Sequence, residues 1–124
     1  VIFDVSGIER DVCAVCNVGL MKMAIDNYLS NAVKYVQGEK RVTVNLRKKE
    51  KGFIFEVINE ADEISAADAN EAWQELSKGD KSRQRQGTSI GMGLAICKRI
   101  FELHDYKGYS RYKDGSVTFV IEGN

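Results

Sequence analysis

Residues 26–36 read DNYLSNAVKYV and combine a helical apolar stripe with polar side chains that a helix does not need. At about 100° per residue, this stretch and the residues before it place their apolar side chains on one face. These side chains are Met21, Ile25, Tyr28, Leu29, Ala32 and Val36. Four hydrogen-bonding side chains follow one edge of that face: Asn27, Asn31, Lys34 and Tyr35. The spacing predicts a helix from about Val18 to Val36, ended by Gly38.

Asn27 and Asn31 have two interpretations at this point. In one, they cap neighbouring loops or face solvent. In the other, they serve a nucleotide, because an amide oxygen is a neutral ligand for Mg²⁺, which binds few protein groups and keeps several waters. Lys34 would then offset phosphate charge, and Tyr35 would cover a purine ring. The spacing alone leaves both interpretations open.

Alternating apolar and polar residues predict a sheet. The expected strands are residues 1–5, 13–18, 41–49, 53–59, 109–112 and 117–121. The third and fourth of these form an antiparallel hairpin, and the last two are joined by an Asp114–Gly115 turn.

Two more helices are expected on the C-terminal side. One begins at the capping-box-like Ser65–Asp68 and continues through Trp73 to Leu76. A polar, basic loop covers residues 77–89, and the last helix covers residues 91–103. The order of the elements predicts an α+β fold with a layer of helices on one face of a mixed sheet.

The composition limits the class of protein. A chain of 124 residues with 44% hydrophobic content predicts a single domain over residues 1–124. Balanced charge, 18 basic and 18 acidic residues, argues against binding to nucleic acid or to an anionic membrane. No apolar run approaches the ~20 residues of a membrane span. Because the chain opens in the strand-like VIFDV without Met, we expect a piece of a longer protein, which could itself be membrane-bound.

Three cysteines, Cys13, Cys16 and Cys97, are too few for a disulfide framework. They predict buried structural thiols and a reducing, cytoplasmic setting. The C-x-x-C spacing of the first two leaves zinc or redox chemistry as the minor alternative.

The segment AIDNYLSNAVKYV (residues 24–36) resembles the N box of sensor histidine kinases, N-x-x-x-N-x-x-K-Y. Three further segments resemble other boxes of that family in the same order. VINEADEIS (57–65) stands at the first glycine box, D-x-G-x-G-I, and AWQELSKGDKSRQRQ (72–86) resembles the F box and the lid. GMGLAICKRIFELH (91–104) is similar to the second glycine box. The resemblance covers residues 1–122.

This resemblance implies the Bergerat fold, a two-layer α/β sandwich. In that fold a mixed, mostly antiparallel sheet of about five strands carries three helices on one face and a flexible ATP lid. ATP and Mg²⁺ are the implied cofactors. By carry-over, Asn31 would ligate Mg²⁺ with help from Asn27, Lys34 would contact phosphate, Tyr35 would pack on adenine, and Asn59 would read its amino group. Lys78 and Arg83 would close the lid, and Gly91 and Gly93 would let the backbone approach the phosphates. The remaining implied ATP contacts are Ile64, Met92 and Leu94.

The first N-box position separates the chemistries of the superfamily. Members that hydrolyse ATP, or that phosphorylate serine in anti-sigma factors, have a glutamate base there. Asn27 cannot accept a proton at neutral pH. The resemblance therefore implies phosphorylation of a histidine on an adjoining helical domain of the same protein, with a response regulator downstream. We expect the isolated domain to be a monomer and the full-length protein a homodimer.

Several positions depart from the family pattern. Asn59 replaces the adenine-reading aspartate, Ala61 and Glu63 replace glycines, and Asp105 replaces the glycine that commonly follows E-L-H. These changes predict weakened ATP affinity and keep a nucleotide-sensing pseudokinase on the same fold as the alternative. The single histidine, His104, ends the last helix and is expected to be structural, because the family's phosphoacceptor lies in a separate domain.

Overall fold

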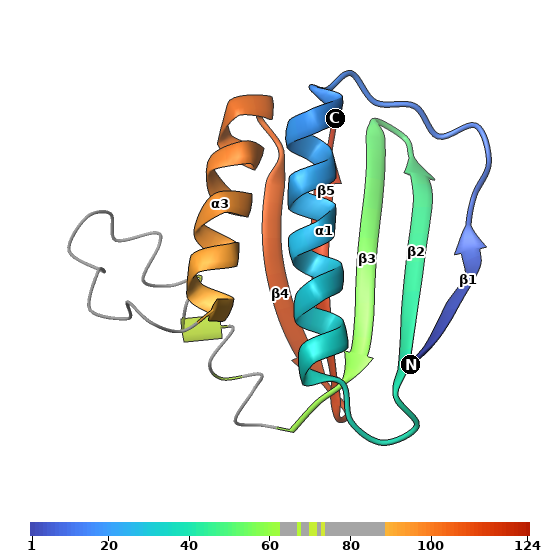
Figure 1. Ribbon diagram of the computed structural model, residues 1–124. Coiled ribbons are helices and arrows are strands. Elements are labelled where there is room, and N and C mark those ends of the chain that lie inside the picture. Colours follow the sequence, from blue (N-terminus) through green and yellow to red (C-terminus); the bar gives the residue numbers. More distant parts are fainter. Residues whose placement is uncertain (63–66, 68–69, 72, 74–88) are drawn as a thin grey trace.

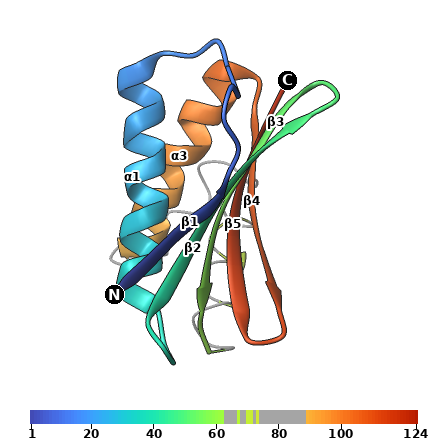
Figure 2. The same ribbon diagram turned by 90° about the vertical axis from the view of Figure 1, so that its right-hand side faces the viewer.

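The computed structural model describes residues 1–62, 67, 70–71, 73 and 89–124 (Figure 1). Its elements are β1 (Ile2–Ile8), α1 (Val18–Tyr35), β2 (Arg41–Lys49), β3 (Gly52–Glu60), α3 (Ser89–His104), β4 (Lys107–Lys113) and β5 (Ser116–Gly123). The strands form one sheet in the order β1-β2-β3-β5-β4. Only the β1–β2 pair is parallel among these neighbours. Both helices cover the same face of the sheet (Figure 2). The predicted α+β fold with a mixed sheet is confirmed.

Helix α1 begins where the sequence predicts. The Asn17 side chain caps it by accepting a hydrogen bond from the Leu20 N–H at 3.0 Å. Its inner face buries Ala24, Tyr28 and Ala32 completely. The Tyr28 hydroxyl donates to the Val120 carbonyl on β5 at 2.8 Å, so this buried polar group is satisfied. This bond fixes α1 over the centre of the sheet.

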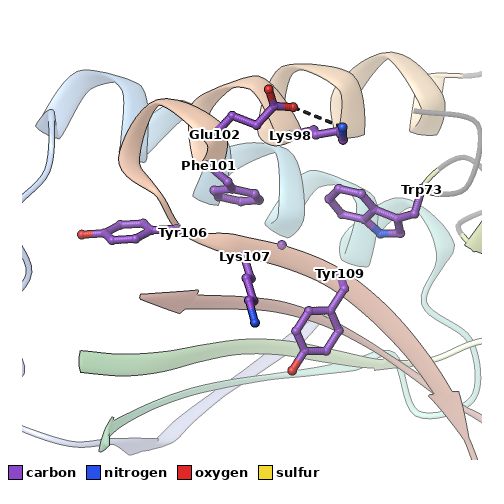
Figure 3. Close-up of a pocket in the computed structure, with 8 residues that line it drawn as sticks. Trp73, Lys98, Phe101, Glu102, Tyr106, Lys107 and Tyr109 are labelled. Carbon is purple, nitrogen blue, oxygen red and sulfur yellow. Dashed lines mark ion pairs between the residues drawn. The ribbon is translucent and has the colours of Figure 1, made fainter. Parts of the chain in front are cut away.

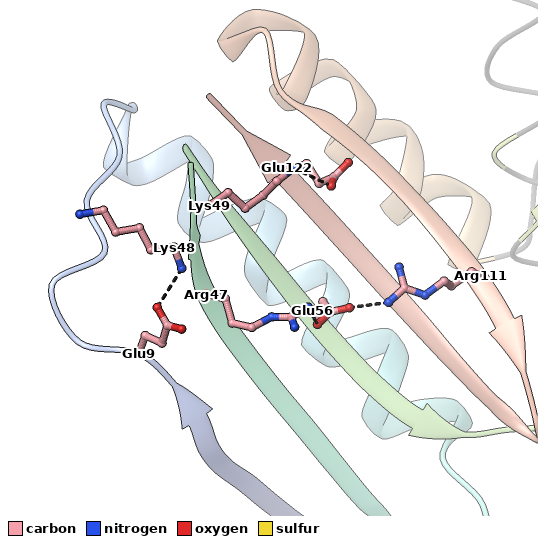
Figure 4. Close-up of polar contacts among 7 residues, drawn as sticks. All are labelled: Glu9, Arg47, Lys48, Lys49, Glu56, Arg111 and Glu122. Carbon is pink, nitrogen blue, oxygen red and sulfur yellow. Dashed lines mark hydrogen bonds and ion pairs between the residues drawn. The ribbon is translucent and has the colours of Figure 1, made fainter. Parts of the chain in front are cut away.

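The face of the sheet opposite the helices carries an ion-pair cluster (Figure 4). Glu56 on the central strand β3 is only 3% exposed, although its carboxylate is charged. It accepts hydrogen bonds from Arg47 on β2, at 3.1 Å, and from Arg111 on β4. The two guanidinium groups lie on either side of the carboxylate, so the buried charge is paired twice.

The predicted strand at residues 13–18 is wrong. Residues 9–17 form an irregular connection between β1 and α1. The outer edge of β1 is open, but this segment does not pair with it, because it carries the chain from the end of β1 to the start of α1. Instead, the Tyr106 hydroxyl donates to the Val15 carbonyl at 2.8 Å.

This connection also corrects the prediction for the cysteines. Cys97 is buried, but Cys13 is exposed and Cys16 is partly exposed, because both lie in the irregular connection. Within the described residues, no three His, Cys, Asp or Glu side chains gather to hold a metal ion.

The third predicted helix falls mostly outside the described residues, and the predicted lid lies wholly outside them except for its last residue, Ser89. The four described residues of that helix, Ala67, Asn70, Glu71 and Trp73, are helical. Helix α3 begins at Ser89, two residues before its predicted start. Neither α1 nor α3 is long and apolar enough to span a membrane.

Candidate functional site

Helices α1 and α3 lie side by side (Figure 1). Their interface brings Asn27 against Gly93. The Asn27 Nδ2 donates to the Met23 carbonyl at 3.0 Å, which orients the amide. Its Oδ1 lies 3.0 Å from the position that a Cβ on Gly93 would take. A glycine permits this close approach of the two helices. The N-box segment and the second glycine-box segment therefore meet in space. For Gly93 this contact is a helix-packing role, and the phosphate contact stays a prediction.

Asn31 lies one turn beyond Asn27 and is buried, with 7% of its surface exposed. Its Nδ2 has no hydrogen-bond partner among the residues that the structure describes. An unpaired buried N–H costs about 1–3 kcal/mol, so such groups are rare without a ligand or water. An N–H donor suits a phosphate oxygen directly, whereas ligation of Mg²⁺ would use the carbonyl oxygen of the same amide.

Asn59 stands near the end of β3 and is 2% exposed. Its Nδ2 donates to the Glu60 carbonyl at 3.1 Å, and this bond fixes which end of the amide is the nitrogen. Its Oδ1 is buried and finds no donor in the described part of the chain. A buried carbonyl oxygen held in this way accepts a hydrogen bond from an amino group, such as the exocyclic amine of adenine.

Ala61 follows two residues later and keeps an ordinary backbone. Its N–H donates to the Gly115 carbonyl at 3.0 Å, and its methyl is buried in the core. Its φ is not one of the positive values found in this chain. The methyl that replaces a family glycine therefore causes no left-handed backbone strain here.

Lys34 and Tyr35 close the C-terminal end of α1. The Lys34 ammonium lies 5.4 Å from the centroid of the Tyr35 ring. Tyr35 is partly buried and packs against the core cluster. Their proposed contacts with phosphate and adenine remain predictions.

The other predicted site residues are placed as follows. Leu94 is completely buried in the core, so its side chain packs inside rather than lining a surface. Gly91 and Met92 lie in the first turn of α3. Ile64, Lys78 and Arg83 lie outside the described residues.

His104 has the structural role that its position predicts. Its Nε2 accepts a hydrogen bond from the Asn17 N–H at 3.0 Å, and this bond requires Nε2 to be unprotonated. Its Nδ1 lies 2.7 Å from the Ile100 carbonyl and donates to it in that tautomer. The ring therefore joins the end of α3 to the start of α1. The hydrophobic periodicity used to find the helices does not reveal this contact between distant residues.

The family profile described as "Histidine kinase-, DNA gyrase B-, and HSP90-like ATPase" matches residues 17–122. The "Probable sensor kinase SilS" of Salmonella typhimurium is 35% identical over 85 residues, which are 68% of this chain and 17% of that protein. The "Sensor protein kinase WalK" of Staphylococcus epidermidis is 32% identical over 124 aligned residues, which cover 91% of this chain and 19% of that protein. The chain thus spans about a fifth of the length of these relatives.

A solved structure of the catalytic domain of histidine kinase ThkA shares this fold. It superposes with a TM-score of 0.72 over 97% of this chain and 74% of that chain, at 19% identity. At that identity the likeness concerns the arrangement of the sheet and helices.

Proposed function

The chain belongs to the family of histidine kinase-, gyrase- and HSP90-like ATPases as the catalytic domain of a two-component sensor histidine kinase, and we propose that it presents Mg·ATP to a histidine. The γ-phosphoryl group would be transferred to a histidine on an adjoining helical domain of the same protein. We further propose that the full-length protein is a homodimer that acts in the cytoplasm on a response regulator.

The observation that carries this proposal is a pair of buried amide atoms, the Asn31 Nδ2 and the Asn59 Oδ1, that have no hydrogen-bond partner among the described residues. The large majority of buried side-chain polar atoms in proteins have hydrogen-bond partners. One unpaired donor on α1 and one unpaired acceptor on β3 match a phosphate oxygen and an adenine amine, respectively. These residues therefore fit the nucleotide that the family implies.

The chain's own residues would bind and orient the nucleotide rather than exchange protons with the reacting groups. Asn27 is an amide whose Nδ2 already donates to Met23, so it provides no general base. Bound Mg²⁺ would supply charge neutralisation at the phosphates. Lys34 would add a positive charge at the same end of α1. The partner histidine would itself be the nucleophile, and help with its proton would come from the partner domain.

A titration with Mg·ATP tests the proposal. We expect saturable binding, and Asn31→Ala and Asn59→Ala should each weaken it by about tenfold, since each removes a buried hydrogen bond to the ligand. Asn70→Ala is the matched control, because Asn70 is exposed and is not among the predicted site residues, and it should leave the affinity unchanged. Absence of saturation up to about 5 mM would reject ATP binding, because KM values rarely exceed about 1 mM.

A nucleotide-sensing pseudokinase is the second candidate, and the acidic residues at and just after the end of β3 favour it. Asp62 accepts a hydrogen bond from Gln37 at 3.0 Å, just beyond the end of α1. Its negative charge, with that of Glu60, would weaken the binding of an anionic nucleotide near that end. Incubation of the full-length protein with labelled ATP separates the two candidates, because only the kinase acquires acid-labile phosphohistidine.

A further inference from the structure

The face of the sheet opposite the helices carries cations from the edge strand β4. A Cβ on Gly108 would meet the Phe101 ring of α3, so Gly108 faces the helices. Its neighbours Lys107 and Tyr109 therefore extend from the opposite face, and Figure 3 shows both side chains pointing away from α3. Arg111 is the next residue on that face, where it joins the ion-pair cluster (Figure 4). Strand β4 thus adds two cations to the face that the helices leave uncovered.

The strand register brings two further cations to this face from β2. One residue from each of four neighbouring strands is aligned in a single row across the sheet: Arg47, Ile54, Glu122 and Lys107. At about 4.8 Å per strand, the backbones of Arg47 and Lys107 are about 14 Å apart. Lys49 stands at the next position of β2 on this face and binds Glu122 at 3.1 Å (Figure 4).

We call this surface the basic face, and its charged residues are Arg47, Lys49, Glu56, Lys107, Arg111 and Glu122. Its cations reach solvent far more than its carboxylates do. The side chains of Arg47, Lys49 and Arg111 are 55%, 44% and 49% exposed. Those of Glu56 and Glu122 are 4% and 25% exposed. A molecule that approaches this face therefore meets mainly positive groups.

The basic face also has a positive net charge. Its four cations and two carboxylates give a formal charge of +2, in a chain of 18 basic and 18 acidic residues. The other charged strand residues on this side of the sheet lie at the opposite end of the strands, where two cations and two carboxylates balance: Arg41, Lys113, Asp4 and Glu60. Arg47 and Arg111 each use Nη2 to bind Glu56. A guanidinium has five N–H donors, so donors remain on both arginines for a second carboxylate.

Apolar side chains lie among these cations. Ile54 and Ile58 stand on either side of Glu56 on β3, face the same way and are partly exposed. Tyr109 on β4 is also partly exposed. A molecule with aliphatic groups beside its carboxylates therefore fits this surface better than a purely ionic one.

We propose that the basic face binds an acidic segment of a partner protein, whose carboxylates pair with the cations while its aliphatic side chains pack on Ile54 and Ile58. Because Glu56 already orients the guanidinium groups of Arg47 and Arg111, the partner meets preorganised donors. Charge complementarity of this kind favours rapid and specific association. The face lies across the sheet from α1 and α3, so the proposal does not depend on ATP binding (Figure 2).

Titration of the ¹⁵N-labelled chain with a short peptide, in which glutamate pairs alternate with single leucines, tests the proposal at about 0.01 M salt. We expect the backbone amide signals around Arg47 and Arg111 to move and saturate, with a dissociation constant of about 1 mM, since four exposed ion pairs contribute about fivefold each. Raising the salt concentration to about 0.1 M shortens the Debye length from about 30 Å to about 10 Å and should weaken binding severalfold. The same peptide with glutamine in place of every glutamate is the control and should not bind.

Three variants locate the binding surface. Lys107→Gln and Arg111→Gln should each weaken binding about fivefold, since each removes one cation of the face. Lys107 makes no bond to Glu56, and Arg111→Gln leaves Glu56 paired with Arg47, so both variants keep a paired carboxylate. Arg99→Gln is the matched control, because Arg99 is 71% exposed on α3, across the sheet from the basic face, and it should leave the affinity unchanged.

Four results would overturn the proposal. The first is no movement of signals up to about 5 mM peptide. The second is movement confined to residues 77–89, which contain four basic residues and one acidic residue. The third is displacement of the peptide by Mg·ATP. The fourth is tighter binding of a short single-stranded DNA, which would assign the face to nucleic acid. Failure of Mg·ATP binding alone would leave the proposal standing.

Discussion

Asn27 and Gly93 meet across the interface of α1 and α3, with the Asn27 Oδ1 3.0 Å from the position of a Cβ on Gly93. A contact at that distance is tighter than ordinary van der Waals packing, so any side chain at position 93 displaces the amide. The orientation of the first N-box asparagine therefore depends on a glycine in a different box.

Replacement of Gly93 by alanine should weaken Mg·ATP binding by about tenfold and change the melting temperature little. The methyl displaces Asn27, while alanine's higher helix propensity, worth about 0.5–1 kcal/mol, offsets the crowding in the fold. Gly19→Ala is the control, because its nearest neighbour, the Asn17 Oδ1, stands at an ordinary 3.5 Å. Isothermal titration of both variants with Mg·ATP measures their affinities. Equal affinities of Gly93→Ala and Gly19→Ala would contradict the prediction.

Asp105 ends α3 in the left-handed region, with a φ of 57°. The Tyr106 N–H donates to the Phe101 carbonyl at 2.9 Å and the Asp105 N–H to the Glu102 carbonyl at 3.3 Å, the pattern of a Schellman motif. Asp105→Gly should therefore raise the free energy of unfolding by about 0.5–1 kcal/mol, and Asp105→Ala should lower it slightly. Urea denaturation measures both. A stabilising alanine would contradict this explanation.

Removal of the Glu56 charge should destabilise the sheet more than removal of a peripheral charge. Glu56→Gln leaves two arginines without their counter-ion, but their side chains are 55% and 49% exposed and regain water. We expect a loss of about 2 kcal/mol, below the 3–5 kcal/mol of a fully buried pair. The control Glu122→Gln breaks the more exposed pair with Lys49 and should cost less than about 1 kcal/mol. Thermal denaturation of both variants compares their losses of stability.

Cys97 should make the fold sensitive to alkali. Burial raises the pKa of its thiol to about 12, from an ordinary value of 9.0. Between these pH values the unfolded chain releases the thiol proton while the folded chain keeps it. The free energy of unfolding therefore falls as pH rises through this range, by up to about 1.4 kcal/mol per pH unit.

Cys97→Ala should reduce that slope above pH 9, although the variant is less stable at neutral pH because it loses the sulfur's packing and its 3.5 Å contact with the Ala24 carbonyl. Urea denaturation at a series of pH values measures the slope directly. An unchanged slope would show that Cys97 does not contribute.

Features set by neighbouring residues could be predicted from the sequence. The apolar stripe of α1 follows a 3.6-residue period, and the β2–β3 hairpin follows the alternation of apolar and polar residues. Each pattern depends only on residues close together in the sequence. The turn at Asp114 and Gly115, with φ values of 52° and 80°, follows from residues that tolerate positive φ. The CAVCNV segment failed because a strand also needs a partner edge, which an alternating pattern does not supply.

The sequence by itself determined which side chains stand along α1 and which chemistry Asn27 excludes, because residue type and helical period are local properties. Only the tertiary structure decided which atoms remain without partners. Asn31 keeps an Nδ2 without a partner among the described residues, and the amide of Asn27 packs against Gly93 on another helix. Such choices depend on distances between segments far apart in the chain, and packing alone sets those distances.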